Sequence, residues 1–178
     1  LIDEKNLYKE DFHITKVLLD QKSPYLRSLL INKGFKHGIK LGAEVRSNSY
    51  FIGKVVGSNY LTSRILLISD LNSKIPVIIE PGAVSAILSG TGDNKLGKIE
   101  YLPENNNIKD GNVVYTSGAD GIISSGIPVG KIVIDNDHAK VKYFSDFTQI
   151  EFVKVYYKKW AYQINFIQVY SQHFLFLF

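Results

Sequence analysis

The side chains that could carry out nucleophilic catalysis are few in this chain, and their spacing matches no known catalytic arrangement. A serine hydrolase needs a serine, a histidine and an acidic residue that converge in the folded protein. Ser117 stands in Thr-Ser-Gly and Ser125 in Ser-Ser-Gly, so neither has the Gly-x-Ser-x-Gly pattern of a nucleophile elbow. We interpret these serines as turn residues, and we predict that the chain is not an enzyme. The four histidines, which we interpret as surface residues, are His13, His37, His138 and His173.

Metal and phosphate sites have equally little support in the sequence. Cysteine is absent, which excludes thiolate ligands. The densest group of other ligands, Asp135-x-Asp137-His138, lacks the glycine and the distal glutamate of a calcium loop. The loops at 90–93 and 118–121 are rich in glycine, but neither opens a predicted helix or contains Gly-Lys-Ser/Thr. We therefore interpret all three stretches as turns and predict neither a metal nor a cofactor.

The net charge of +4 suggests an acidic partner until its distribution is considered. Residues 1–151 carry 18 basic and 17 acidic side chains, a net charge of +1, and the other three charges are Lys154, Lys158 and Lys159. A nucleic-acid surface requires basic residues clustered on one face of the folded part. The lysines here are scattered along the chain, so we predict no nucleic-acid partner.

The composition favours an all-β protein that has two small barrel-like units. Val, Ile, Tyr, Phe and Thr make up 61 of the 178 residues, whereas Ala contributes only 6. Short apolar runs recur every 10 to 15 residues between turn residues, which is typical of sandwiches and small barrels. A helix is expected only in the first ten residues, as the end of an upstream coiled coil. The predicted strands are 12–19, 27–32, 50–56, 64–68, 75–79, 84–88, 97–102, 112–116, 129–135, 138–143 and 150–157.

A weak internal repeat suggests where the chain divides. Residues 40–45 (KLGAEV) are similar to residues 109–114 (KDGNVV), and IGKVV at 52–56 is similar to VGKIV at 129–133. Either two related β units follow one another, or both pieces are common hairpin patterns. Gly42 and Gly111 occupy the same place in the repeat, and we predict that each adopts a turn conformation unfavourable for a side chain.

The repeat places the boundary near Glu80-Pro81-Gly82, and strands exchanged across that boundary remain an open alternative. The resulting division is a coiled-coil end or linker at 1–11, a first barrel at 12–80, a second at 81–155 and an aromatic tail at 156–178.

Several stretches, taken in order, resemble the family of the rod shape-determining protein MreC in its extracytoplasmic region. They extend over residues 20–155 and include DQKSPYLR at 20–27, RILLISD at 64–70, NSKIPV at 72–77 and GIPVG at 126–130. Each stretch is weak alone, but their common order makes the resemblance specific. The residues that carry it are read as structural: Gly34, Gly38, Gly42, Gly53, Asp70, Ser73, Pro76, Gly111, Ser117, Gly118, Gly121, Gly126, Pro128 and Gly130.

This resemblance implies a non-catalytic scaffold of the bacterial cell-elongation machinery. The family has a transmembrane helix, a periplasmic coiled coil and two small β-barrels, and it organises peptidoglycan synthesis and rod shape. The implied partners are a peptidoglycan transpeptidase, further copies of the same protein and membrane-embedded shape proteins. The implied location is the periplasmic face of the inner membrane. The partner-binding residues are unknown from sequence.

The two ends of the chain carry expectations of their own. Met is absent and the first residue is Leu1, so we expect a piece of a longer protein with its anchor upstream. Residues 156–178 hold 9 of the 22 aromatic residues and no Gly, Pro or acidic residue. This tail is an interfacial anchor, an element packed on a barrel, or a non-native reading of the gene's end. We favour the last interpretation.

Two other classes of function compete with the scaffold. A pair of β-barrels is also the architecture of chymotrypsin-like hydrolases, which the missing catalytic constellation disfavours. A β-barrel module that binds nucleic acid or saccharide is the other, and the nearly neutral charge of residues 1–151 disfavours nucleic acid.

Overall fold

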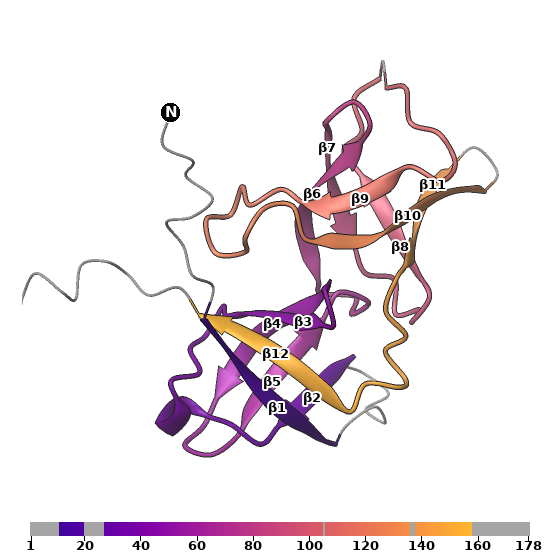
Figure 1. Cartoon of the computed structure of the whole chain (residues 1–178). Helices are drawn as coiled ribbons and strands as arrows, with labels where there is room; N and C mark the ends of the chain where they lie inside the picture. Colours follow the sequence, from indigo (N-terminus) through magenta and orange to yellow (C-terminus); the bar gives the residue numbers. More distant parts are fainter. Residues whose placement is uncertain (1–10, 20–26, 105, 136–137, 158–178) are drawn as a thin grey trace, which may run out of the picture.

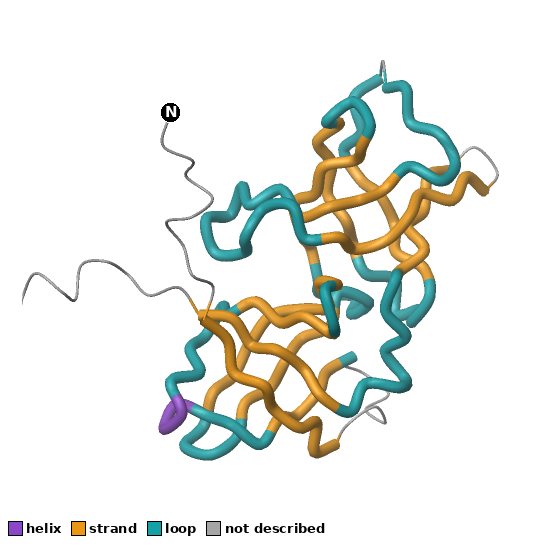
Figure 2. Tube along the Cα trace, viewed as in Figure 1, coloured by secondary structure: helices purple, strands orange, loops and turns teal. Residues whose placement is uncertain are grey.

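The chain forms two closed β-barrels of six strands each, connected by two segments (Figure 1). The computed structural model describes residues 11–19, 27–104, 106–135 and 138–157. Strands make up most of these residues, and loops connect them at the ends of each barrel (Figure 2). The prediction of an all-β fold with two barrel units is therefore confirmed.

The first barrel takes strands from both ends of the described chain. Its neighbours run β1-β12-β3-β4-β5-β2 and close on β1. A 3-10 turn, η2 (Phe35–His37), lies between β2 and β3. The strands are β1 (Asp11–Leu19), β2 (Ser28–Ile31), β3 (Glu44–Ser47), β4 (Tyr50–Ser58), β5 (Ser63–Leu67) and β12 (Phe152–Tyr157).

The second barrel is continuous in sequence, and its neighbours run β10-β11-β8-β7-β6-β9. All eleven predicted strands are present in the two barrels, and β3 is the additional one. The strands of this barrel are β6 (Lys74–Glu80), β7 (Val84–Ser89), β8 (Leu96–Glu100), β9 (Val113–Thr116), β10 (Pro128–Asp135) and β11 (His138–Tyr143).

The predicted boundary at residues 80–82 is wrong. Strand β6 pairs with β7 and β9 and so belongs to the second barrel, which means that the chain changes barrel between Leu67 and Lys74. Residues 81–83 form the turn of the β6–β7 hairpin, in which Ile79 lies opposite Val84. A tight turn and a domain boundary both favour Pro and Gly, so composition did not distinguish them.

The predicted division also fails at the two ends of the barrels. Strand β12, predicted in the second barrel, lies between β1 and β3 of the first. Strand β6, predicted in the first barrel, belongs to the second. Asp11 already belongs to β1, and Tyr156 and Tyr157 belong to β12. The rest of the predicted tail, and the N-terminal helix expected in residues 1–10, lie outside the described residues.

The two barrels have the same strand connectivity, but the first is circularly permuted. In the second barrel, the strands β6 to β11 follow one another in sequence. The pairings of the first barrel are reproduced one for one if β12 takes the place of β6 and β1 to β5 take the places of β7 to β11. The first strand of this barrel is therefore supplied by the end of the described chain.

The repeated sequence pieces occupy equivalent places in this common topology. The amide of Gly42 donates to the carbonyl of Val55 at 2.8 Å, and the amide of Gly111 donates to that of Ile132 at 2.9 Å. Gly53 on β4 and Gly130 on β10 are equivalent as well, because an added Cβ would collide with a carbonyl of the neighbouring strand in each case. The repeat thus has a structural counterpart in both barrels.

The cores consist of the inward side chains of each closed sheet. In the first barrel, Val45, Phe51, Ile65 and Val155 are completely or almost completely buried. In the second barrel, the buried set includes Ile75, Val77, Ile79, Leu88, Val114, Ile132 and Val141. Alternation of buried and exposed residues along β6 illustrates how period-two patterning turns one side of a strand inward.

Gly42 and Gly111 have positive φ angles of 80° and 83°, as predicted. Nothing lies within 4 Å of the place of a Cβ at Gly111, so a substitution there tests backbone strain alone. We expect Gly111→Val to lower the free energy of unfolding by about 1 kcal/mol or more in urea denaturation. Gly57→Val is the matched control, because Gly57 lies in a strand without positive φ and with ordinary space for a side chain. Equal losses in both variants would contradict the strain argument.

Candidate interaction surface and the junction between the barrels

The junction begins with Asp70, a buried carboxylate in the segment that leads from β5 to β6. Its Oδ2 accepts a hydrogen bond from the amide of Arg27 at 2.7 Å. Its Oδ1 accepts from the amide and the side chain of Asn72, at 2.8 and 3.0 Å. Buried carboxylates are stable only when their oxygens are satisfied in this way. Asp70 therefore fixes the connecting segment against the start of β2.

The loop after β7 packs closely on this connecting segment. The amide of Gly90 donates to the carbonyl of Ser73 at 3.0 Å, and that of Gly92 donates to Ser69 at 2.8 Å. A Cβ at Gly90 would overlap the carbonyl of Asp70. The Nε of Arg27, which comes from the first barrel, donates to the carbonyl of Gly92 at 3.1 Å. Gly90 and Gly92 thus connect the loop after β7 to the segment between β5 and β6 and to Arg27 of the first barrel.

The loop between β9 and β10 reaches from the second barrel to the first. Its Ser124 amide donates to Oε2 of Glu44, which is buried on β3, at 2.7 Å. The other oxygen of Glu44 accepts from Nε of Arg46 at 2.8 Å. Thr116, the last residue of β9, holds this loop: its Oγ1 donates to the carbonyl of Ser124 at 2.6 Å and accepts from the amide of Ile127 at 3.0 Å. Glu44 is therefore a second polar connection between the barrels.

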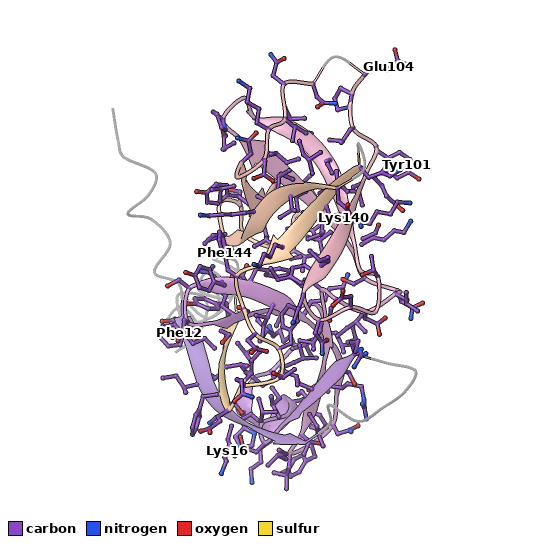
Figure 3. All side chains as sticks on the ribbon, turned by 90° about the vertical axis from the view of Figure 1, so that its right-hand side faces the viewer. Phe12, Lys16, Tyr101, Glu104, Lys140 and Phe144 are labelled. Atoms are coloured by element: carbon purple, nitrogen blue, oxygen red, sulfur yellow. The ribbon has the colours of Figure 1, made fainter. Side chains whose placement is uncertain are left out.

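Aromatic residues complete the junction. The hydroxyl of Tyr143 donates to the carbonyl of Ile68 at 3.3 Å, and burial raises the pKa of this phenol far above its usual value. Tyr143 therefore remains a hydrogen-bond donor at physiological pH. The ring of Phe144 lies 5.0 Å from that of Tyr50 on β4, between the two barrels (Figure 3). Within the first barrel, next to the Glu44 connection, the guanidinium of Arg46 lies 3.9 Å above the ring of Tyr156 on β12.

The residues predicted from the sequence lie in four kinds of position in the structure. Asp70, Ser73 and Pro76 belong to the connection and to β6, and Ser117 donates its hydroxyl hydrogen to the carbonyl of Pro76 at 3.1 Å. Pro128 begins β10. The turn glycines, each with positive φ, are Gly38, Gly42, Gly111, Gly118, Gly121 and Gly126. The close-contact glycines, at which an added Cβ would collide with a backbone carbonyl, are Gly34, Gly53 and Gly130.

His13 and His37 belong to the first barrel and do not join Ser117, and His138 begins β11 opposite Asp135 of β10. His13 on β1 lies beside His37, and burial together with the neighbouring Lys33 and His37 lowers its pKa below the usual value. Ser117 lies on the second barrel and is engaged in its loop. Among residues 11–19, 27–104, 106–135 and 138–157, no three His, Asp or Glu side chains gather as metal ligands. In the same residues, no helix is long and apolar enough to span a membrane.

Sequence reasoning missed an exposed apolar face on the first barrel, which we call the β1–β12 face. Its apolar members are the outward residues Phe12, Ile14, Leu18 and Phe152, and Lys16 and Lys154 lie on the same side, opposite Phe152 and Ile14. Phe12 lies opposite Tyr156, and their rings are 5.2 Å apart. A signal was available in β1, because three of its four outward positions are apolar, the fourth being Lys16, while the inward Thr15 is polar and buried. This inversion is typical of a strand whose outer face binds another surface.

The fold and the junction define a class of protein: two six-stranded β-barrels that are joined by a polar contact between their loops. A model of the family described as "Rod shape-determining protein MreC, barrel core" matches residues 17–157. The chain belongs to this family.

Curated relatives and solved structures agree with this assignment. The cell shape-determining protein MreC of Cereibacter sphaeroides is 33% identical over 146 residues, which cover 80% of this chain and 48% of that protein. The MreC of Caulobacter vibrioides is 34% identical over 141 residues, covering 79% and 40%. This chain thus spans about half the length of the curated relatives it matches.

Two solved structures show the same fold. The crystal structure of MreC from Pseudomonas aeruginosa has a TM-score of 0.75 at 23% identity and covers 83% of this chain and 99% of that one. A complex between a penicillin-binding protein and MreC from Helicobacter pylori gives a TM-score of 0.56 at 16% identity, with 83% and 98% covered.

Proposed function

We propose that this chain is the barrel core of a non-catalytic scaffold that organises peptidoglycan synthesis during bacterial cell elongation. Membership of the MreC family supports this role, as do relatives that carry the name cell shape-determining protein. The proposed location is the periplasmic face of the inner membrane, with anchoring through a segment N-terminal to the barrels. That segment would also contact the membrane-embedded shape proteins.

The proposed main partner is the periplasmic domain of a peptidoglycan transpeptidase, and further copies of the chain are a second partner. The observation that carries this proposal is the β1–β12 face. Ile14 and Phe152 are both more than half exposed on adjacent strands of a closed barrel, where the internal core is already complete. Apolar anchors of this kind contribute most of the binding energy in protein interfaces. The complex known for the Helicobacter pylori relative is of the same kind.

We expect the chain to bind the transpeptidase domain of its own organism, and Ile14→Ser combined with Phe152→Ser to weaken binding about tenfold or more. The measurement is surface plasmon resonance with the immobilised transpeptidase domain. Phe12 is left unchanged because its ring contacts Tyr156. Ile134→Ser, an exposed apolar residue of β10, is the matched control and should bind like the wild type.

Two results would contradict the proposal at different levels. Unchanged binding by the double variant would show that the transpeptidase binds elsewhere on the barrels. Absence of binding by the wild type at tens of micromolar, together with absence of self-association, would contradict the scaffold function itself.

A further inference from the structure

A second exposed apolar surface lies on the first barrel, at the end formed by η2 and the loop between β4 and β5. We call its three residues, Phe35, Tyr60 and Leu61, the aromatic tip. They are 58%, 54% and 53% exposed. Figure 1 shows η2 at the outer edge of the first barrel, on the side away from the second barrel. The aromatic tip is therefore separate from the junction between the barrels.

The backbone holds the aromatic tip in a fixed shape. The amide of Phe35 donates to the carbonyl of Asn59 at 2.9 Å, and that of Lys36 donates to Tyr60 at 3.2 Å. A Cβ at Gly34 would collide with the carbonyl of Asn59, so the two loops approach as closely as a glycine allows. The rings of Phe35 and Tyr60 meet edge to face with centroids 5.3 Å apart. Binding through the tip thus requires little ordering of these loops.

Three lysines lie within or beside the η2 turn of the aromatic tip in the sequence. Lys36 places its Nζ 5.3 Å from the ring centroid of Tyr60, and Lys33 and Lys40 flank the same turn. Among the described residues, these three lysines form no ion pair with an acidic side chain. Between positions 21 and 69, the only acidic residue is Glu44, which is buried and hydrogen-bonded on β3.

The charge of the first barrel differs in sign from that of the second. Residues 11–67, which supply five of the six strands of the first barrel, carry nine basic and three acidic side chains, a net charge of +6. Residues 68–151 carry seven basic and eleven acidic ones, a net charge of −4. The small net charge of residues 1–151 therefore conceals a strong asymmetry. A barrel of this charge attracts an anionic surface at distances of about a Debye length, roughly 10 Å at 0.1 M salt.

We propose that the aromatic tip binds directly to the surface of an anionic lipid bilayer. Phe, Tyr and Leu side chains insert at the boundary between headgroups and acyl chains, and lysines around them bind the lipid phosphates. The three apolar residues protrude at the end of a barrel, a shape that suits insertion into a bilayer. This contact is additional to the anchor in the proposed function, and it would hold the first barrel against the membrane.

The test is flotation of the full 178-residue chain with vesicles of phosphatidylcholine that contain or lack phosphatidylglycerol. We expect binding to the anionic vesicles only, with loss of binding as salt rises. Phe35→Ser with Leu61→Ser should weaken binding at least about tenfold, since both insert apolar surface. Lys33→Gln, Lys36→Gln and Lys40→Gln should each weaken it by about fivefold.

The matched control is Tyr101→Asn with Ile134→Ser, two exposed residues of the second barrel, one of which has a positive φ that Asn tolerates. Every variant keeps residues 158–178, so a difference between variants reports on the tip and not on these residues. Circular dichroism melting verifies that each variant is folded. Transpeptidase binding of the tip variant should stay unchanged, which separates this proposal from the proposed function.

Three results would overturn the inference. The first is absence of wild-type binding to anionic vesicles. The second is equal loss of vesicle binding in the tip and control variants. The third is a tip variant that binds vesicles normally but no longer binds the transpeptidase, which would make the tip a protein-docking surface.

Discussion

A chain that ends at Glu151 should lose its first barrel and keep its second. Strand β12 pairs with both β1 and β3, and its Val153 and Val155 are buried in the first core. Removal of these two valines alone costs roughly 3–6 kcal/mol of burial. Removal of the strand also opens two sheet edges. Because small domains are stable by only about 5–15 kcal/mol, we expect the first barrel to unfold.

Hydrogen exchange measured by mass spectrometry would show this outcome directly. Amides of residues 28–67 should exchange as in an unfolded chain, whereas those of residues 74–143 should remain protected. The control is a chain that ends at Tyr157, which keeps β12 whole. We expect its melting temperature to equal that of the full chain. A decrease of several degrees would show that residues 158–178 belong to the core. Protection of both barrels in the shorter chain would contradict the role given to β12.

The second large effect is expected for Asp70→Ala, with a loss of about 3 kcal/mol in the free energy of unfolding. The substitution removes the acceptor of two amides, that of Arg27, which is half-buried, and that of Asn72, which is an exposed residue. Each unsatisfied buried group costs about 1–3 kcal/mol. Urea denaturation measures the loss, and the slope m shows whether the two barrels still unfold together.

Asp93→Ala is the matched control for Asp70. Asp93 also accepts a backbone hydrogen bond, from the amide of Lys95 at 2.8 Å, but it is exposed. Water replaces the lost acceptor there, so we expect a loss of less than about 1 kcal/mol. If both variants lose equal stability, burial of the Asp70 carboxylate is not the source of its effect.

The strands were predictable because local patterning determines them, and β3 shows where this fails. Its sequence, Glu44-Val45-Arg46-Ser47, has charged residues where a strand pattern would have alternating apolar ones. Glu44 is nevertheless buried, because Arg46 and the Ser124 amide satisfy its oxygens. Ser124 is 80 residues away, so nothing near Glu44 in the sequence indicates that it is buried.

The assignment of strands to barrels was beyond local patterning for a similar reason. The sequence of β12 does not indicate that this strand pairs with β1 and not with β10 or β11, which precede it in the chain. Asp70 was named from the family resemblance and Glu44 was not, and only the structure shows that Asp70, Gly90 and Glu44 meet other loops at the junction. The β1–β12 face and the aromatic tip were not predicted, because apolar residues in strands and turns are usually assigned to the core. The charge of the first barrel escaped notice because it was averaged with that of the second.

The permuted first barrel has a consequence for the order of folding. The β1–β12 ladder joins Asp11 to Tyr157, almost the whole length of the described chain, whereas the second barrel pairs strands between residues 74 and 143 only. Contacts between distant residues form slowly, because a long loop must close before they are made. The first barrel should therefore close last. Folding of the second barrel comes earlier and places β12 near β1 and β3, the strands with which it pairs. During synthesis, the edges of β1 and β3 remain unpaired until β12 has been synthesised.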